Sequence, residues 1–183
     1  MNRFASLLIC VLAMPPAIAG EDGEEPLEQA GSAVASFGKA LKSTLVQAMQ
    51  SGGPLAAISV CNTEAPAIAE AVSLEQGMRV SRVSLKIRNP GNAPNTWQSE
   101  VLKSFEARKQ AGEKAADLSW HETVTVGGQQ EFRFMKAIPT GGLCLQCHGS
   151  DIQPEVTQKL AELYPEDQAT GFSAGAVSYT HLR

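Results

Sequence analysis

Two cysteines and a histidine stand close together near the carboxyl end, as Cys144, Cys147 and His148 in the run Cys-Leu-Gln-Cys-His. Two thiols three residues apart can bond to the two vinyl groups of one haem, and a histidine directly after them can be the proximal ligand of its iron. A C-x-x-C pair also occurs in redox and zinc sites. A zinc site needs two further ligands at comparable spacing, and the sequence has no second C-x-x-C. We therefore predict one covalently attached haem c.

The first nineteen residues are typical of a secretory signal peptide. Asn2-Arg3 gives a short positive start, an apolar stretch of residues 4–14 follows, and Ala17-Ile18-Ala19 is a small-x-small cleavage site. The apolar stretch is too short to span a bilayer. We expect cleavage before Gly20 and a periplasmic mature protein, with residues 20–26 as a flexible acidic start and no membrane span after cleavage. A lipid anchor on Cys10 is the alternative.

Charge and cysteine count narrow the classes of function further. The net charge is −4 at pH 7, which gives no support for nucleic-acid binding. Of the 4 cysteines, Cys10 leaves with the signal peptide, and Cys144 and Cys147 are used for the haem. Cys61 then has no disulfide partner in an oxidising compartment, so its thiol needs another explanation.

Two helices are predicted in the first half of the chain. Apolar residues recur at steps of three and four from Leu27 to Ala48, which predicts a long amphipathic helix that ends at Gly52-Gly53. So long an apolar stripe also permits pairing with a second copy, and a homodimer is one possibility. Pro54 begins a second helix, and Pro66 should kink or restart it just after Cys61.

Strands and shorter helices are predicted in the second half. Alternation over residues 78–87, with a slip at Arg82-Val83, predicts a bulged strand. Residues 118–126 and 130–138 alternate around Gly127-Gly128 and predict a β-hairpin. A helix over about 97–111 begins at a capping box and ends at Gly112, and a short helix covers 154–163. We predict a single α+β domain over residues 27–176 with a small antiparallel sheet, a long N-terminal helix and flanking helices.

The last seven residues, 177–183, resemble translated adapter sequence from sequencing libraries. We expect the natural chain to diverge after about Ala176, so that a final strand is missing, and we give His181 no role.

The second axial ligand of the iron is open on the residues alone. Candidates are Met49, Met78, Met135, His121 and Cys61. Methionines at apolar positions are ordinarily core residues, and a cysteine on an apolar helix face is usually an inert small hydrophobe. The missing disulfide partner favours Cys61, without settling the choice.

Several segments resemble one known family, the exported single-haem c-type proteins with a PAS-like fold. The similarity covers roughly residues 30–175 and rests on short segments at 58–62, 65–69, 82–94, 144–149 and 164–171. In that family the haem iron is held by the C-x-x-C-H histidine and by a cysteine thiolate. The resemblance implies a PAS-like fold, and it implies that His148 and Cys61 are the two axial ligands.

Four basic residues are clustered between the predicted helices, and two of them, Arg82 and Arg88, fall in a family segment. Haem propionates need cationic or hydrogen-bonding partners. We predict Arg82 or Arg88 as a propionate contact; the alternative is a solvated strand face.

The resemblance implies a redox or small-ligand sensor, in which a displaceable thiolate would open a site for CO or NO. The alternative is a simple periplasmic mono-haem electron carrier. An enzyme such as a peroxidase is disfavoured, because no distal acid–base arrangement can be picked out. A sensor role requires a separate redox or signalling protein partner. An anionic thiolate donor should stabilise ferric iron and lower the reduction potential.

Overall fold

The computed structural model describes residues 24–182. The predicted signal peptide, residues 1–19, and residues 20–23 of the predicted acidic start lie outside the described residues. Within the described part of the chain, no helix has the length and apolar character needed to cross a membrane.

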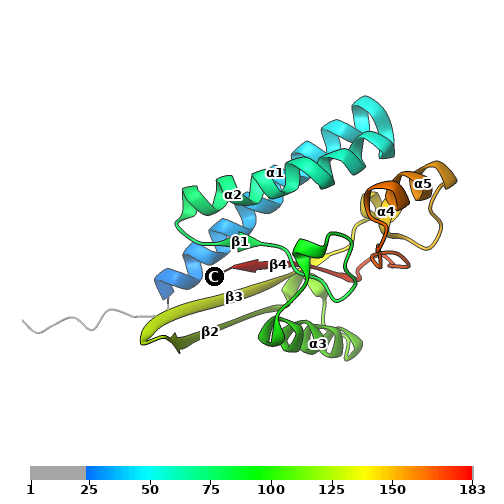
Figure 1. The fold of residues 1–183 in the computed structure, drawn as a ribbon. Coiled ribbons are helices and arrows are strands. Elements are labelled where there is room, and N and C mark those ends of the chain that lie inside the picture. Colours follow the sequence, from blue (N-terminus) through cyan, green and yellow to red (C-terminus); the bar gives the residue numbers. More distant parts are fainter. Residues whose placement is uncertain (1–23, 183) are drawn as a thin grey trace, which may run out of the picture.

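The long helix α1 (Glu24–Ser59) is interrupted where the sequence predicts its end. Gly52 and Gly53 have non-helical backbone angles, and Gly53 has φ 66° and ψ −161°. Residues with a Cβ rarely adopt that conformation, so a glycine is needed there. Pro54 begins the segment after the break. The chain thus turns back on itself, and the second arm continues into α2 (Ala65–Gln76) alongside the first (Figure 1).

A five-residue π-helix, Val60–Glu64, separates the two parts of that second arm. The backbone N–H of Ala65 donates to the carbonyl of Val60, five residues back. Pro66 occupies the first turn of α2, where its missing N–H costs nothing. The predicted restart after Cys61 is confirmed. Cys61 itself lies in the π-helix, a feature that is rare and frequent at functional sites.

The sheet has four strands, all antiparallel, in the order β1-β4-β3-β2. The hairpin prediction is confirmed by β2 (Ser119–Val126) and β3 (Gln129–Pro139). Gly127 and Gly128 join them with φ of 59° and 84°. Two positive φ values fit a type I′ turn, which matches the twist of the strands it connects.

The strand predicted over residues 78–87 is wrong in length, because β1 is only Val80–Ser81. Beyond it the backbone bonds to loops rather than to a strand: Ser84 N–H donates to Asn92 O at 3.1 Å, and Gln168 N–H donates to Ile87 O at 2.8 Å. An extended segment that buries every second side chain produces the same alternation as a strand. Val83, for example, is 5% exposed.

A final strand is present, which corrects the expectation that it is missing. The strand β4 (Val177–Leu182) pairs with β1 on one side and β3 on the other, at the centre of the sheet. A foreign origin of residues 177–183 stays a prediction.

Helices cover both faces of the sheet, and adjacent residues of β3 show which helix covers which face. Phe134 packs with Phe37 and Val72 of α1 and α2, whereas Met135 packs with Leu102 and Phe105 of α3 (Thr96–Gln110). Side chains alternate across a strand, so β3 contributes to a core on each side. Figure 1 shows the α1–α2 pair on one side of the sheet and α3 on the other. The predicted α+β architecture is confirmed.

We expect Leu102→Ala to lower the free energy of unfolding by about 2–5 kcal/mol, because it leaves a cavity in a well-packed core. Leu102 is 0% exposed, whereas Leu74, on α2, is 80% exposed. Urea unfolding followed by circular dichroism measures the difference, and Leu74→Ala is the matched control. Equal losses in the two variants would contradict this description of the core.

Candidate functional site

The Cys-x-x-Cys-His run lies directly after β3, in a short helical segment. Cys144 ends a 3-10 turn (Gly142–Cys144), and Cys147 and His148 lie in the one-turn helix α4 (Leu145–His148). Both thiols are free and half-buried. A Cβ on the next residue, Gly149, would lie 2.6 Å from the carbonyl oxygen of Leu145, so only glycine fits there without rearrangement.

The ring of His148 is oriented by its neighbours. Nδ1 lies 2.8 Å from the carbonyl oxygen of Ala169, so Nδ1 carries the proton and donates. The lone pair of the neutral ring is then on Nε2, which is how metal-ligating histidines are usually held. Phe172 packs edge-on against the ring, with centroids 6.0 Å apart, and its N–H donates to the His148 carbonyl at 2.9 Å.

Burial and charge both favour the neutral imidazole. Desolvation, followed by the positive charge of Arg88, lowers the pKa of His148 to about 4. The ring is therefore unprotonated at neutral pH, as an iron ligand must be.

Arg88 joins the motif to the segment that follows α5 (Pro154–Leu163). Its Nη2 lies 2.9 Å from Asp167 Oδ2, and its Nε donates to the same oxygen at 3.0 Å. Nη2 also donates to the carbonyls of Cys147 at 2.6 Å and Ala169 at 3.2 Å. Nη1 lies 3.4 Å from His148 Nε2. The structure thus brings Arg88 to the motif, and a contact with a haem propionate stays a prediction.

Asp167 and Ala169 are parts of the site to which the sequence reasoning gave no role. Asp167 Oδ1 accepts from the N–H of Ala169 at 2.8 Å, which positions the carbonyl that holds His148. The available signal was their place in the segment 164–171, on which the family resemblance partly rests.

Asp167→Ala should lower the free energy of unfolding by about 3 kcal/mol, because it leaves the guanidinium of Arg88 buried without its carboxylate. The two side chains are 10% and 11% exposed. Glu113→Ala is the matched control, since it removes the partner of Arg108 from an exposed pair and should change little. Urea unfolding of both variants measures this, and similar small losses would show that the buried pair has no special weight.

Cys61 lies next to the motif, although more than eighty residues separate them in sequence. Burial raises the pKa of its thiol, while the charges of Arg82 and Arg88 act to lower it. Cys144 lies close enough to raise this pKa further. The packing agrees: Ile58, one turn before Cys61, belongs to a cluster with Val156, Leu160 and Tyr164, against which Cys147 also packs. The helix that carries Cys61 therefore lies against the segments around the motif.

Arg82 also lies at this junction. Burial lowers the pKa of Arg82, and the neighbouring groups that act on it are Cys61 and Tyr164. Tyr164 in turn lies near Asn62, the residue after Cys61: burial raises the pKa of Tyr164, and Asn62 acts to lower it. Both predicted arginines thus lie near Cys61, and both belong to the connection between β1 and α3.

The other candidates for the second axial position lie elsewhere. Met135 is fully buried between the sheet and α3, and Met78 packs against the α1–α2 core. The ring of His121 stacks on Phe132 at 6.0 Å in the hairpin. Met49 lies in α1, just before the glycine break. Of the five candidates, Cys61 is the one that the structure places beside the motif.

Comparison with known proteins agrees with the resemblance expected from the sequence. Residues 21–178 match the model of the Tll0287-like family. The structure is similar to the crystal structure of the cyanobacterial heme-protein Tll0287, with a TM-score of 0.62 and 21% sequence identity over 87% of this chain and 94% of that one. No curated protein matches. The structural likeness at this identity concerns the fold.

Proposed function

Because this chain belongs to the Tll0287-like family, we propose that it is a c-type haem-binding protein whose iron has His148 and Cys61 as axial ligands. The observation that carries the proposal is the hydrogen bond that His148 Nδ1 donates to Ala169 O. It places the lone pair of the ring on Nε2, which faces Arg88 Nη1 at 3.4 Å and lies near two free thiols and a third cysteine. The similar structure is that of a heme-protein, which supports the same class of cofactor.

The residues around the motif fit a haem. Cys144 and Cys147 would hold it covalently, each thiol adding across one vinyl group so that sulfur bonds to carbon and the hydrogen passes to the neighbouring vinyl carbon. When bound, haem supplies a one-electron couple at iron and a coordination position that a small ligand can take. Ala169 and Asp167 fix the direction of the His148 ring. Burial raises the pKa of the Cys61 thiol, and the positive charges of Arg82 and Arg88 only partly offset this effect, so coordination to iron would have to supply the rest of the stabilisation of the thiolate.

We further propose that the exported protein acts in the periplasm as a redox or small-ligand sensor. A cysteine ligand held in a π-helix, rather than in a regular helix, is placed in a segment whose hydrogen-bond pattern can rearrange. Release of Cys61 from iron would leave a position for CO or NO, and the change at the π-helix would reach α1 and α2. A separate redox or signalling protein would then receive the change.

The alternative is a simple mono-haem electron carrier. The motif itself is compatible with this role, because Cys144, Cys147 and His148 would suffice to hold a haem and a carrier needs only the one-electron couple that the haem supplies.

Spectra and potentials distinguish the two functions. The protein should be produced in a host with the maturation machinery for c-type haem, and its midpoint potential and absorption spectra recorded with and without CO or NO. A sensor should bind the gas in the reduced state, and the absorption bands of the gas-free protein should be replaced by those of the gas adduct. Rapid reversible cycling with no gas binding would overturn the sensor role in favour of the carrier.

A further inference from the structure

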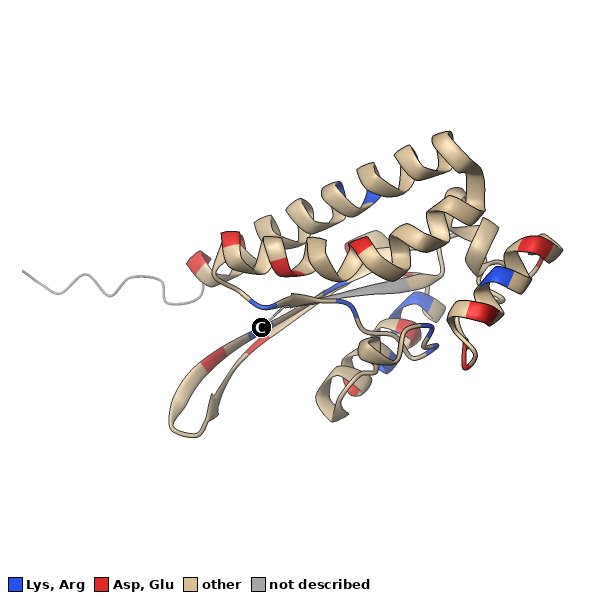
Figure 2. Cartoon of the chain, turned by 45° about the horizontal axis from the view of Figure 1, so that its top comes forward, with Lys and Arg blue, Asp and Glu red and all other residues tan. Residues whose placement is uncertain are grey.

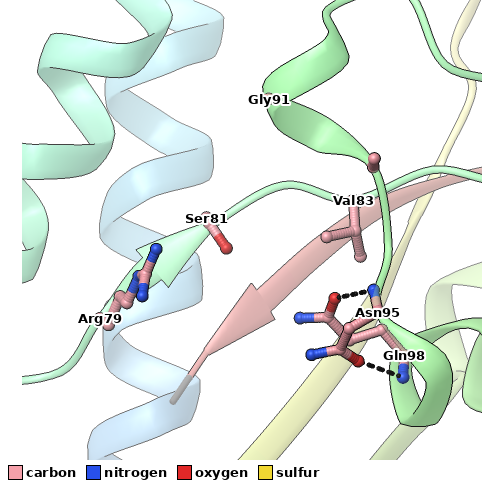
Figure 3. Close-up of a pocket in the computed structure, with 7 residues that line it drawn as sticks. Arg79, Ser81, Val83, Gly91, Asn95 and Gln98 are labelled. Carbon is pink, nitrogen blue, oxygen red and sulfur yellow. Dashed lines mark hydrogen bonds between the residues drawn. The ribbon is translucent and has the colours of Figure 1, made fainter.

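A pocket separate from the cysteine motif lies between the segment around β1 and the start of α3 (Figure 3). It encloses about 210 Å³, and Arg79 and Ser81 line it together with Val83, Asn95 and Gln98. A single water needs roughly 10–15 Å³ of such space, so the pocket has room for several waters or for a small organic molecule.

The capping box of α3 determines which atoms face this pocket. The N–H of Asn95 donates to Gln98 Oε1 at 2.8 Å, and the N–H of Gln98 donates to Asn95 Oδ1 at 3.1 Å. Backbone N–H groups can only donate, so both side-chain oxygens must face them. The two amide NH₂ groups therefore point the other way, and Figure 3 shows them directed away from the helix.

The amide of Gln98 stands out because it is buried. Gln98 is 6% exposed, and its Nε2 has no hydrogen-bond partner among the residues that the structure describes. A buried donor without a partner costs about 1–3 kcal/mol, so such groups usually have an occupant to bind. The direction of this donor, into a pocket, indicates a hydrogen-bond acceptor there.

The charge around the pocket selects the kind of acceptor. Arg79 contributes a guanidinium and Ser81 a hydroxyl, and no acidic residue occurs among the described lining residues. Residues 77–95, which form most of the wall, contain four basic residues and no acidic one. Figure 2 shows basic residues on this connection, whereas acidic residues are spread over the helices and the β2–β3 hairpin. An anion is therefore favoured, and Val83 and Ala93 give it an apolar neighbour.

We propose that this pocket binds a small carboxylate, with the carboxylate oxygens accepting from Gln98, Asn95, Ser81 and Arg79. The role of this site as an input of the sensor rests on the proposed function. Its ability to bind a carboxylate does not. The link between them is Arg82, which lies between Ser81 and Val83 in the chain but is half-buried near Cys61. A ligand that orders residues 79–83 thus acts on the surroundings of Cys61.

Isothermal titration of the holoprotein with acetate, propionate and succinate tests the site. We expect saturable binding of at least one of these acids, and none of acetamide or propionamide, which have the same shape without the charge. Absence of binding by all three acids, or equal binding of the neutral amides, would overturn the proposal.

Gln98→Glu is the decisive variant, because a glutamate at this position can still complete the capping box. It replaces the buried donor with an anionic oxygen, and we expect it to weaken carboxylate binding at least tenfold. Gln110→Glu, the same change at the exposed end of α3, is the matched control and should bind as the wild type does. Undiminished binding by Gln98→Glu would overturn the site.

The signalling part has its own readout. The midpoint potential of the haem should shift on addition of the acid that binds, and the shift should be absent in Gln98→Glu. If an acid binds and the midpoint potential does not change, the pocket is a binding site but not an input of the sensor. A protein purified without haem would instead contradict the proposed function, and the calorimetric result would still stand.

Discussion

Replacing both Cys144 and Cys147 with serine should abolish covalent haem attachment. Their thiols are free and lie on the same short helical segment as His148, and serine hydroxyls do not form thioethers. The wild type, denatured in alkaline pyridine, should keep its coloured haem and show the added mass of one haem by mass spectrometry. The double variant should be colourless after denaturation and show the mass of the polypeptide alone.

Each single variant should retain one thioether bond and a weaker yield, because one vinyl group then stays unmodified. Cys61→Ser is the control for cysteine loss in general, and it should keep the full covalent haem. A colourless wild-type protein from a competent host would contradict the proposed cofactor itself. A double variant that keeps its haem through denaturation would show that another residue forms the bond.

The parts of the structure that follow from the sequence are those set by local interactions. The capping box at Asn95, the type I′ turn at Gly127 and the glycine break at Gly53 are each determined by residues within four positions of one another. Positive φ at the glycines and the reciprocal cap bonds need no distant partner, so spacing alone identifies them.

The sheet could not be derived in the same way, because strand order is decided by distant segments. β1 is two residues long and pairs only with β4, about a hundred residues later. The alternation over residues 78–87 correctly marks which side chains are buried but not what the backbone bonds to. Period-two burial is shared by strands and by extended loops that pack on a core, so the sequence predicted too long a strand.

The candidate site likewise combines residues that local spacing identifies with residues that only the fold brings together. Cys144, Cys147 and His148 are recognisable by spacing, but the groups that orient them are remote: Arg88 is sixty residues from His148 and Asp167 is seventy-nine from Arg88. An ion pair over such a separation leaves no local pattern. For the second axial ligand, the residues alone left five candidates, and the resemblance selected Cys61. The packing of Ile58 against Tyr164 explains how the helix that carries Cys61 reaches the motif.

The largest effect on the properties of the haem is expected from Cys61→Ser. Removing an anionic donor destabilises ferric relative to ferrous iron, so the midpoint potential should rise. Axial ligands set haem potentials over about 0.8 V, and a rise on the order of 0.1 V or more is expected for this change. Redox titration gives the potential, and resonance Raman spectroscopy shows whether an iron–sulfur vibration is lost.

Two companion variants separate charge from packing. Cys61→Met keeps a sulfur ligand without the negative charge, so its potential should also rise while the iron stays six-coordinate. Ser59→Ala, an exposed change on the same helix, should leave both potential and spectrum unchanged. If Cys61→Ser behaves like Ser59→Ala, the thiolate is not on the iron. The free cysteine would then be a packing residue at the α1–α5 contact, and the sensor mechanism would lose the ligand on which it depends.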